Sequence, residues 1–351
     1  MRILIIKTSS LGDIIHALPA VNLLVKHIPD AEIDWLVKPE FANVLRYCPN
    51  LNEMIFFDRK KFASLKYGIK YCTGLIKYIR KKKYDIVIDF QGLMRSALFA
   101  GLADAEIKAG FAAPREFLSA FFYNRRVKAD FKHVVDRNLA LVREVLGCKI
   151  EEENDKSLFE LLPCDEFAVS AEKILNDAGR DSSAALIAVV PGADWKSKKF
   201  PCDFFVDIME RIHVAVKADF MLIGGENERK DAEKIENIAA LSNMKIINCI
   251  GRASIGESIE LLRRADIITG NDSGPMRIGA AMGVPLCVFA GSSRPENNGP
   301  YSSKCRIFRN ERCSCSGCLR RECPHEPDIL CHRIDIENVA DYIIREISKN
   351  N

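Results

Sequence analysis

The stretch MRILIIKTSSLGD, residues 1–13, decides the fold. It opens with a short isoleucine-rich run, typical of a buried strand in a parallel sheet, and predicts a strand over 1–7. A turn of small residues then leads into a helical pattern with the carboxylate of Asp13 at its mouth. In open α/β sheets ligands collect beyond the carboxyl ends of the strands, so we expect part of a site in this turn. Helix capping alone would also explain its serine, glycine and aspartate.

The same alternation of a β-branched run and a helix-length segment continues along the chain. It is the pattern of parallel sheets with crossover helices, and it predicts two similar α/β lobes. In the first half the predicted strands are 1–7, 31–37, 54–57, 84–89 and 107–111, and the predicted helices are 13–28, 61–82, 93–103 and 133–147. In the second half the predicted strands are 185–190, 219–224, 245–250, 266–269 and 285–290.

The length of 351 residues also favours two domains, because single cores rarely grow beyond about 250 residues. An acidic stretch at 151–155 interrupts the alternation, and we place the linker at 150–165. The expected domains are therefore 1–160 and 161–335. The last helix, within 336–351, could pack back on the N-terminal domain or stay with the second.

The formal charge of +3 is too small to indicate nucleic-acid binding on its own. Basic runs at 59–61, 80–83 and 125–126 all lie in the first half, so this lobe could face a phosphate-bearing partner. Solvated helix ends are the alternative interpretation.

The sequence has no apolar stretch near the roughly 20 residues that span a bilayer. The opening apolar run is too short for a signal peptide, and no small-residue cleavage site follows it. We therefore expect a cytoplasmic protein that is soluble or bound only to a membrane surface.

Two turns of the second half suit a diphosphate. PGADWKSKKFP, residues 191–201, carries a glycine and three lysines ahead of a helix that starts near Pro201. Helix N-termini favour anions and a lysine adds a point charge, although a solvated basic loop is the alternative. In the second turn, GNDSGPMR at 270–277, Ser273 and Gly274 stand at capping positions. The same residues would also appear in a merely well-capped helix.

The dipeptide Gly224-Gly225, followed by Glu226, ends another predicted strand. It would let a ligand approach the backbone, with Glu226 accepting hydrogen bonds from ribose hydroxyls, and a plain glycine-rich turn is the alternative. Neither lobe carries G-x-G-x-x-G after its first strand, which argues against a nicotinamide-dependent dehydrogenase.

A dense cysteine cluster lies near the end of the chain. Its members are Cys313, Cys315, Cys318, Cys323 and Cys331, interleaved with His325 and His332. Thiolates at such spacing can hold a structural zinc ion or an iron–sulfur cluster. Free or redox-labile thiols are the alternative, since C-x-C-x2-C is not a strict zinc spacing.

Taken together, these loops resemble glycosyltransferase family 9, the heptosyltransferases of the lipopolysaccharide inner core. The matching segments run in order through nearly the whole chain: KTSSLGDIIHALPA (7–20), IDWLV (33–37), YDIVIDFQGLMRSAL (84–98), REFLSAFFYNRR (115–126), PGADWKSKKFP (191–201), GGENE (224–228) and NDSGPMRIGAAMGVP (271–285). The resemblance implies the GT-B fold, in which two Rossmann-like domains face each other across a cleft. It also implies inverting transfer of heptose from ADP-heptose, held by the second lobe, to Kdo-lipid A, held by the first, with no cofactor required.

Residue by residue, the resemblance makes Asp13 the catalytic base and Lys198 the lysine on the donor phosphate. From the turns and the resemblance together, we expect the donor to be bound by Gly192, Lys198, Glu226, Asp272, Ser273, Gly274 and Arg277. We expect the acceptor to be bound by Lys7, Ser10, Gly12, Arg59, Lys60, Gln91, Arg95 and Arg115.

Two positions depart from the family pattern. Arg277 stands where many members have histidine, which keeps a positive charge near a diphosphate but excludes any role for a neutral imidazole. Phe200 replaces the usual tryptophan, a change expected to affect packing only. A family member with a different sugar or acceptor, and a non-catalytic nucleotide-sugar binding protein, remain the alternatives.

Overall fold

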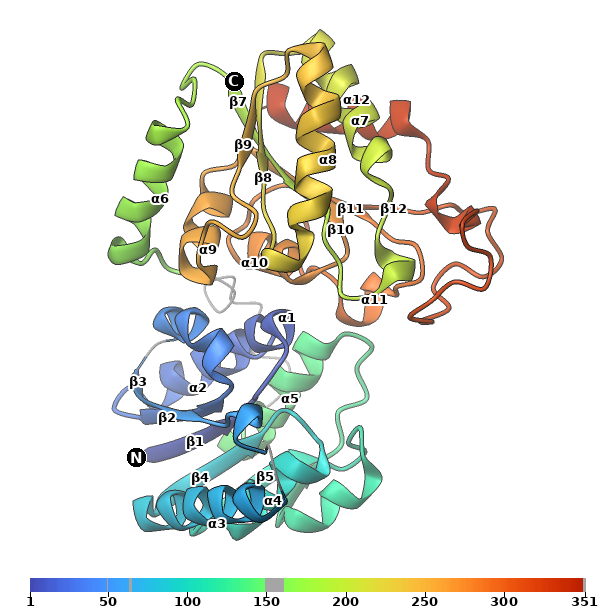
Figure 1. Cartoon of the computed structure of the whole chain (residues 1–351). Helices are drawn as coiled ribbons and strands as arrows, with labels where there is room; N and C mark the ends of the chain where they lie inside the picture. Colours follow the sequence, from blue (N-terminus) through green and yellow to red (C-terminus); the bar gives the residue numbers. More distant parts are fainter. Residues whose placement is uncertain (49, 63–64, 149–160, 350–351) are drawn as a thin grey trace. The chain divides into compact units, whose positions relative to one another are not determined.

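The computed structural model describes residues 1–48, 50–62, 65–148 and 161–349. The chain divides into two compact units, Met1–Glu160 and Leu161–Asn351, and each is built around its own parallel sheet (Figure 1). The predicted linker at 150–165 falls mostly outside the described residues.

The sheet of the first unit has six strands in the order β3-β2-β1-β4-β5-β6, all parallel to their neighbours. The strands are β1 (Arg2–Ile6), β2 (Glu32–Val37), β3 (Leu51–Phe56), β4 (Tyr84–Asp89), β5 (Ala105–Phe111) and β6 (Arg125–Val127). The α-helices are α1 (Leu11–Ile15), α2 (Leu18–His27), α3 (Leu65–Lys82), α4 (Met94–Leu102) and α5 (Val134–Leu146). Short 3-10 segments are η1 (Pro39–Tyr47), η2 (Arg59–Phe62) and η3 (Phe117–Phe122).

The second unit repeats this topology, with the order β12-β11-β10-β7-β8-β9. The strands are β7 (Ala185–Val190), β8 (Ala218–Leu222), β9 (Ile246–Asn248), β10 (Ile267–Asn271), β11 (Leu286–Phe289) and β12 (Cys305–Phe308). The α-helices are α6 (Asp165–Asp177), α7 (Cys202–Ala215), α8 (Arg229–Ala239), α9 (Ile255–Arg263), α10 (Gly274–Ala281), α11 (Pro295–Asn298) and α12 (Ile336–Ser348). The 3-10 segments are η5 (Lys196–Lys198), η6 (Glu226–Glu228), η7 (Ala240–Ser242) and η8 (Leu330–His332).

Both sheets have the Rossmann strand order, in which the chain reverses direction across the sheet beside its first strand. In the first unit this topological switch lies between β1 and β4, and in the second between β7 and β10. Ligands of such sheets bind in the crevice outside the carboxyl ends of the strands at the switch. The turn after residue 6 and the turn after residue 190 are therefore where the fold places a site.

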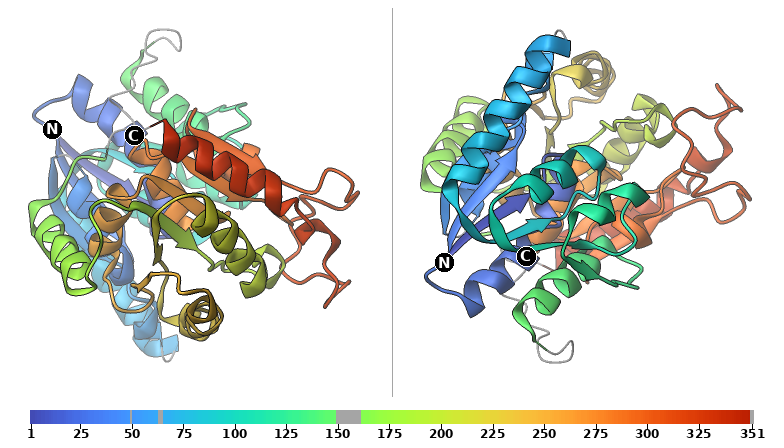
Figure 2. Two further views of the ribbon diagram at one scale, coloured as in Figure 1. Left: turned by 90° about the horizontal axis from the view of Figure 1, so that it is seen from above. Right: turned by 90° about the horizontal axis from the view of Figure 1, so that it is seen from below.

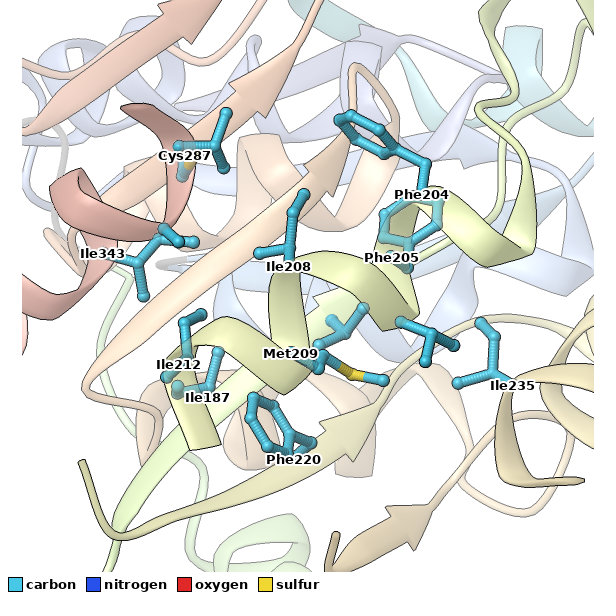
Figure 3. Close-up of a cluster of buried hydrophobic side chains, with 14 of the residues drawn as sticks. Ile187, Phe204, Phe205, Ile208, Met209, Ile212, Phe220, Ile235, Cys287 and Ile343 are labelled. Carbon is cyan, nitrogen blue, oxygen red and sulfur yellow. The ribbon is translucent and has the colours of Figure 1, made fainter. Parts of the chain in front are cut away.

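The core of the second unit forms around α7, whose apolar face is Phe204, Phe205, Ile208, Met209 and Ile212 (Figure 3). These side chains pack against the sheet and against Ile343 of α12. Figure 2 shows α12, in red, beside α7. The last helix thus belongs to the second unit, because its apolar face completes that core.

The predicted helix over 13–28 is two helices in the structure. Pro19 accounts for the break, since proline has no backbone N–H and is tolerated only in the first turn of a helix. It stands in the first turn of α2, directly after α1 has ended. The break leaves Asp13 on a short separate helix that follows the carboxyl end of β1.

Candidate functional site

In the first unit, the turns after β1 and β4 are tied together at the switch point. Ile6 and Asp89 are paired in the register, so the residues that follow them leave the sheet side by side. The side-chain oxygen of Gln91 accepts hydrogen bonds from the backbone N–H of Thr8 (3.1 Å) and of Ser9 (3.3 Å). Gln91 therefore fixes the turn that leads to the predicted base.

Asp13 lies half-buried in α1, with Ser10 at the N-cap of that helix. Its Oδ2 accepts hydrogen bonds from the backbone N–H and from the hydroxyl of Ser10, each at 3.2 Å. Gly12 is buried between them. This contact orients the carboxylate, and it is also the contact that a plain capping role predicts, so the catalytic role stays a proposal.

Lys7 is buried at the end of β1, where its Nζ donates a hydrogen bond to the carbonyl oxygen of Phe90 (3.1 Å). Burial lowers the pKa of its ammonium, while the nearby carboxylates of Asp13 and Asp89 act to raise it. The guanidinium groups of Arg115 and Arg137 act to lower that pKa further. The turn predicted from sequence thus gathers charges of both signs around one buried lysine.

Asp89 and Tyr123 are site residues that the sequence reasoning missed. Asp89 is fully buried, and its Oδ2 accepts a hydrogen bond from the Tyr123 hydroxyl (2.7 Å). Its Oδ1 accepts from the backbone N–H groups of Gln91 (2.8 Å) and Gly92 (3.3 Å), and burial raises its pKa. The sequence did contain an indication of this contact. Asp89 ends the apolar strand YDIVID, and a carboxylate buried there needs hydrogen-bond partners.

Arg115 lies in the turn after β5, at the same end of the sheet as the turn after β4. The carbonyl oxygen of Gly92 accepts a hydrogen bond from the backbone N–H of Glu116 (3.1 Å), which brings Arg115 beside the β4 turn. Gly92 has φ +64°, and a side chain there would press on Pro114 and on the Arg115 backbone. Glycine at this position therefore lets the two turns approach each other.

The other predicted acceptor residues also follow the carboxyl ends of strands, but farther from Lys7. Arg95 is in the first turn of α4, which follows the β4 turn. Arg59 and Lys60 are in η2, after the edge strand β3, which is separated from β1 by β2. Adjacent strands are about 4.8 Å apart, so this places η2 about 10 Å across the sheet from Lys7. The structure therefore does not bring η2 together with the β1 turn.

In the second unit, the turns after β7 and β10 are likewise tied at the switch point. The side-chain amide of Asn271 donates a hydrogen bond to the carbonyl oxygen of Pro191 (2.7 Å), and its oxygen accepts one from the backbone N–H of Phe200 (3.3 Å). Gly270 packs against the Val190 backbone with φ +159°, where a Cβ would collide with the Val190 carbonyl oxygen. These contacts bring the two predicted diphosphate turns together.

A buried carboxylate lies between two cations in these turns. Asp272 is 3% exposed, with the Nζ of Lys198 at 3.9 Å and the Nη2 of Arg277 at 3.5 Å. Arg277 also donates hydrogen bonds to the backbone carbonyl (2.7 Å) and the side-chain oxygen (2.5 Å) of Asn298 in α11. The three charged groups leave one positive charge in excess at the start of α10.

Ser273 occupies the N-cap position of α10 without a capping hydrogen bond from its side chain, and Gly274 begins the helix. The Oγ of Ser273 is buried and, within the described residues, has no hydrogen-bond partner. A buried polar group without a partner is costly and calls for a ligand or an ordered water. Together with the open N–H groups at the helix start, it suits an anionic ligand oxygen.

The loop that carries Lys198 is held from two sides. The Nζ of Lys198 lies 4.7 Å from the centre of the Trp195 ring, a cation–π contact. The hydroxyl of Ser197 contacts that of Ser292 (2.8 Å), and the Ser197 carbonyl oxygen contacts His332 Nε2 (3.0 Å). The Phe200 ring stacks on His332 at 4.2 Å, so this loop rests on the segment that follows the cysteine cluster.

Of the two glutamates in η6, Glu228 rather than the predicted Glu226 lies against the β7 turn. The Glu226 carboxylate pairs with Arg229, which lowers its pKa. Glu228 accepts a hydrogen bond from the Gly225 backbone N–H (2.8 Å), and a Cβ on Gly192 would come within 2.7 Å of its side chain. Burial raises the pKa of Glu228. A spacing of two residues along one 3-10 turn decides which carboxylate faces the loop, and the sequence pattern did not resolve that.

The cysteine cluster does not form a metal centre in the described structure. The Sγ atoms of Cys313 and Cys315 are 3.5 Å apart, but no group of three His, Cys, Asp or Glu side chains in the described residues is arranged to hold an ion. Burial raises the pKa of Cys331 to about 12, and the neighbouring Cys313 thiol raises that of Cys315. The geometry of the described residues thus shows no formed metal site, and the zinc or iron–sulfur expectation stays a prediction.

In each unit, then, the predicted turns are paired at that unit's own topological switch point. A protein-family model described as glycosyltransferase family 9 (heptosyltransferase) matches residues 72–328. The chain belongs to glycosyltransferase family 9. It is therefore a glycosyltransferase, as the resemblance predicted.

Relatives of this family 9 protein cover nearly its full length. Lipopolysaccharide heptosyltransferase 1 of Pseudomonas aeruginosa is 26% identical over 335 residues, which cover 93% of this chain and 88% of the relative. The structure of E. coli ADP-heptose lps heptosyltransferase II matches with TM-score 0.80 and 20% identity over 100% of this chain and 99% of that chain. E. coli heptosyltransferase WaaC with ADP matches with TM-score 0.75 and 23% identity over 99% and 100%. These likenesses confirm the GT-B class of α/β fold.

None of the helices in the described part of this family 9 protein combines the length and apolar character needed to cross a membrane.

Proposed function

We propose that this family 9 glycosyltransferase transfers heptose from ADP-heptose to the Kdo-lipid A acceptor of the lipopolysaccharide inner core, with inversion at the anomeric carbon and no required cofactor. The proposal is supported by full-length relatives named as lipopolysaccharide heptosyltransferases. The observation that carries it is the arrangement of Lys198 and Arg277 around Asp272 at the start of α10. The proposed location is the cytoplasm, peripheral to the inner membrane.

In the proposed complex, the ADP diphosphate binds at the switch point of the second unit. Lys198 and Arg277 supply positive charge, while Asp272 holds both cations in place before the ligand arrives. Ser273 and Gly274 add a buried hydroxyl and open helix N–H groups. Gly192 keeps the β7 turn free of a side chain, with Glu228 beside it and Glu226 at the outer end of η6.

The acceptor binds at the switch point of the first unit, where the cations Lys7, Arg115 and Arg137 lie near the carboxylates of Asp13 and Asp89. Gln91, Ser10 and Gly12 shape the turn, and Arg115 faces solvent beside it. The phosphates and carboxylates of a Kdo-lipid A headgroup match these cations. Arg59, Lys60 and Arg95 lie farther along the same edge, within reach of a large headgroup rather than of the reacting hydroxyl.

In the proposed reaction, an acceptor hydroxyl attacks the anomeric carbon of heptose from the face opposite ADP. The new carbon–oxygen bond forms as the bond to the diphosphate oxygen breaks, and ADP leaves with that electron pair. Asp13 takes the proton of the hydroxyl. A carboxylate is a weak base at neutral pH, so it acts late, when bond formation has made the hydroxyl acidic. One displacement gives one inversion.

The first test is transfer with the purified full chain, ADP-heptose and Kdo-lipid A, followed by NMR assignment of the product anomer. The expected product carries heptose with inverted configuration, and ADP is released in equal amount. If ADP is released only with a different sugar nucleotide or a different acceptor, the protein is a family 9 enzyme with another substrate. Absence of both transfer and hydrolysis with ADP-sugars would support the non-catalytic alternative, which Arg277 in place of the family histidine keeps open.

The second test is Asp13→Asn, which keeps the size of the side chain and removes the base. We expect turnover to fall by about 10²–10⁴-fold, the usual contribution of a general base, with ADP-heptose affinity unchanged in calorimetry. The matched control is Asp30→Asn, on an exposed residue after α2 in the same unit. Turnover close to that of the unchanged enzyme would remove Asp13 from the role.

A further inference from the structure

The segment η3 of the first unit presents large apolar side chains to solvent. Phe117, Leu118 and Phe121 are 71%, 59% and 61% exposed, and the two phenylalanine rings meet edge to face at 6.0 Å. Single exposed apolar residues are ordinary on protein surfaces, but a contiguous group of aromatic and aliphatic side chains marks an interaction site.

The opposite side of η3 is buried and packs against the rest of the first unit. Ser119 and Ala120 of the same segment are buried. The Phe122 ring fits against α4 at Gly101, where an added Cβ would come within 2.6 Å of it. Since η3 is anchored on α4, the exposure of its outer face is a fixed feature of the unit.

The helix on which η3 packs, α4, also exposes apolar side chains, since Leu98 and Leu102 are 36% and 37% exposed. They are four residues apart and thus on one face of the helix. The described part of the second unit offers a contrast. Its most exposed apolar side chains, Val214 and Leu241, are each the single large one exposed in their element.

Basic side chains border the apolar area. The Arg126 guanidinium lies 5.5 Å from the centre of the Phe121 ring, and Arg115 and Lys128 are exposed on either side of η3 in sequence. The adjacent acidic group, Glu116, is engaged, since its carboxylate accepts a hydrogen bond from the first backbone N–H of α4 (2.6 Å). Arg125 is the one nearby cation with a described ion pair, to Glu144 at 3.0 Å.

The charge of the whole unit has the same sign. Residues 1–160 hold 26 Lys and Arg against 20 Asp and Glu, a formal charge of +6, whereas residues 161–351 hold 25 against 28, or −3. The positive excess of the chain therefore resides entirely in the unit that carries η3. Aromatic side chains with flanking arginine and lysine are the composition that binds the interface of an anionic bilayer.

We infer that the η3 surface, made of Leu98, Leu102, Phe117, Leu118, Phe121 and Arg126, docks the first unit on an anionic phospholipid bilayer. Phe117, Leu118 and Phe121 enter the headgroup and acyl boundary, while Arg126 pairs with lipid phosphates. The inference deepens the proposed function, since the acceptor proposed there is itself a membrane lipid. It concerns the bilayer as a surface and not the acceptor, so it can be tested with neither substrate present.

The experiment is sedimentation of the full chain with vesicles of phosphatidylethanolamine and phosphatidylglycerol, free of lipid A, against vesicles of phosphatidylcholine. We expect binding to the anionic vesicles that weakens at high salt, because exposed charges are screened. F117S/L118S/F121S should weaken binding at least about tenfold, and R126Q a few-fold. The control V214S/L241S removes similarly exposed apolar groups from the second unit and should bind as the unchanged chain does.

A second readout does not depend on the folding of the triple variant. F121W places an indole in the η3 surface, and vesicles of brominated lipid should quench its fluorescence. The reference is the unchanged chain, whose two tryptophans, Trp35 and Trp195, lie outside this surface.

Two results would overturn the inference. One is equal vesicle binding by F117S/L118S/F121S and the unchanged chain, and the other is no more quenching in F121W than in the unchanged chain. Dissociation of a dimer by the triple variant without loss of vesicle binding would assign the surface to a second copy and overturn it as well. Vesicle binding without heptose transfer would count against the proposed function alone.

Discussion

At the scale of single residues, the proposed donor role of the loop over 191–201 depends on how Lys198 is placed. Its ammonium lies 3.9 Å from Asp272 and 4.7 Å from the Trp195 ring centre, and it is 16% exposed. A preorganised cation in such a setting stabilises the negative charge that develops on a leaving diphosphate.

We expect Lys198→Ala to lower kcat/KM for the donor by about 10²–10³-fold, the loss usual for one preorganised electrostatic contact. The matched control is Lys196→Ala, in the same 3-10 segment but exposed. Steady-state kinetics with varied donor measures both. Similar losses in the two variants would mean that the loop contributes only general positive charge.

The buried pair Asp89–Tyr123 gives a prediction about stability and pH. Tyr123→Phe removes a hydrogen bond from a carboxylate whose pKa burial already raises, so that pKa should rise further. A buried carboxylate that loses a donor costs about 1–3 kcal/mol of unfolding free energy.

The sign of the pH dependence follows from linkage. Asp89 has a raised pKa in the folded state, so folding becomes less favourable as pH rises from the unfolded value through the folded value. The Tyr123→Phe penalty should therefore be large at high pH, where Asp89 is ionised, and shrink as the pH is lowered and Asp89 protonates. Urea unfolding of both proteins across this range tests it, and a penalty independent of pH would contradict the assignment.

Residue patterns predicted the turns of the site but not all of its side chains. Lys7, Asp13, Lys198 and Asp272 each follow a strand closely, so local sequence placed them. The Asp89–Tyr123 contact spans 34 residues and depends on how β4 and the segment after η3 meet, which no local pattern records. The choice of Glu228 over Glu226 depends on the packing of η6 on the β7 turn in the same way.

At the scale of elements, the approach of β10 to β7 depends on Gly270. We expect Gly270→Ala to lower the unfolding free energy by at least about 2 kcal/mol, since the new methyl group would meet the Val190 backbone and the positive φ is unfavourable for alanine. Chemical denaturation measures the change.

The matched control is Gly74→Ala, in the helix α3, where an added Cβ meets no atom within 4 Å. Alanine is the better helix former, so this variant should be more stable by about 0.5–1 kcal/mol. An equal response of the two variants would mean that Gly270 is not at a close approach.

The sequence predicted most elements because apolar β-branched runs and helical periods alternate so regularly. The structure adds β6 and β12, whose short sequences RRV and CRIF include basic residues instead of an uninterrupted apolar run. Both are edge strands of their sheets, and they form because a neighbouring strand offers hydrogen bonds, not because of their own composition.

At the scale of the whole molecule, the two units should respond differently to nucleotide. With ADP at about 100 times its Kd, binding adds about 2.7 kcal/mol to the stability of the folded form that binds it. We expect hydrogen exchange to slow in residues 191–201 and 270–277 of the second unit and to stay unchanged in residues 7–13 of the first. Protection of 7–13 without protection of 191–201 would reverse the proposed division between donor and acceptor.

The contact between Ser197 and His332 joins distant parts of the chain. His332 lies 135 residues farther along, and α12, which completes the core around α7, is synthesised later still. Residues 332–348 must therefore be synthesised before the loop over 191–201 acquires these contacts during translation.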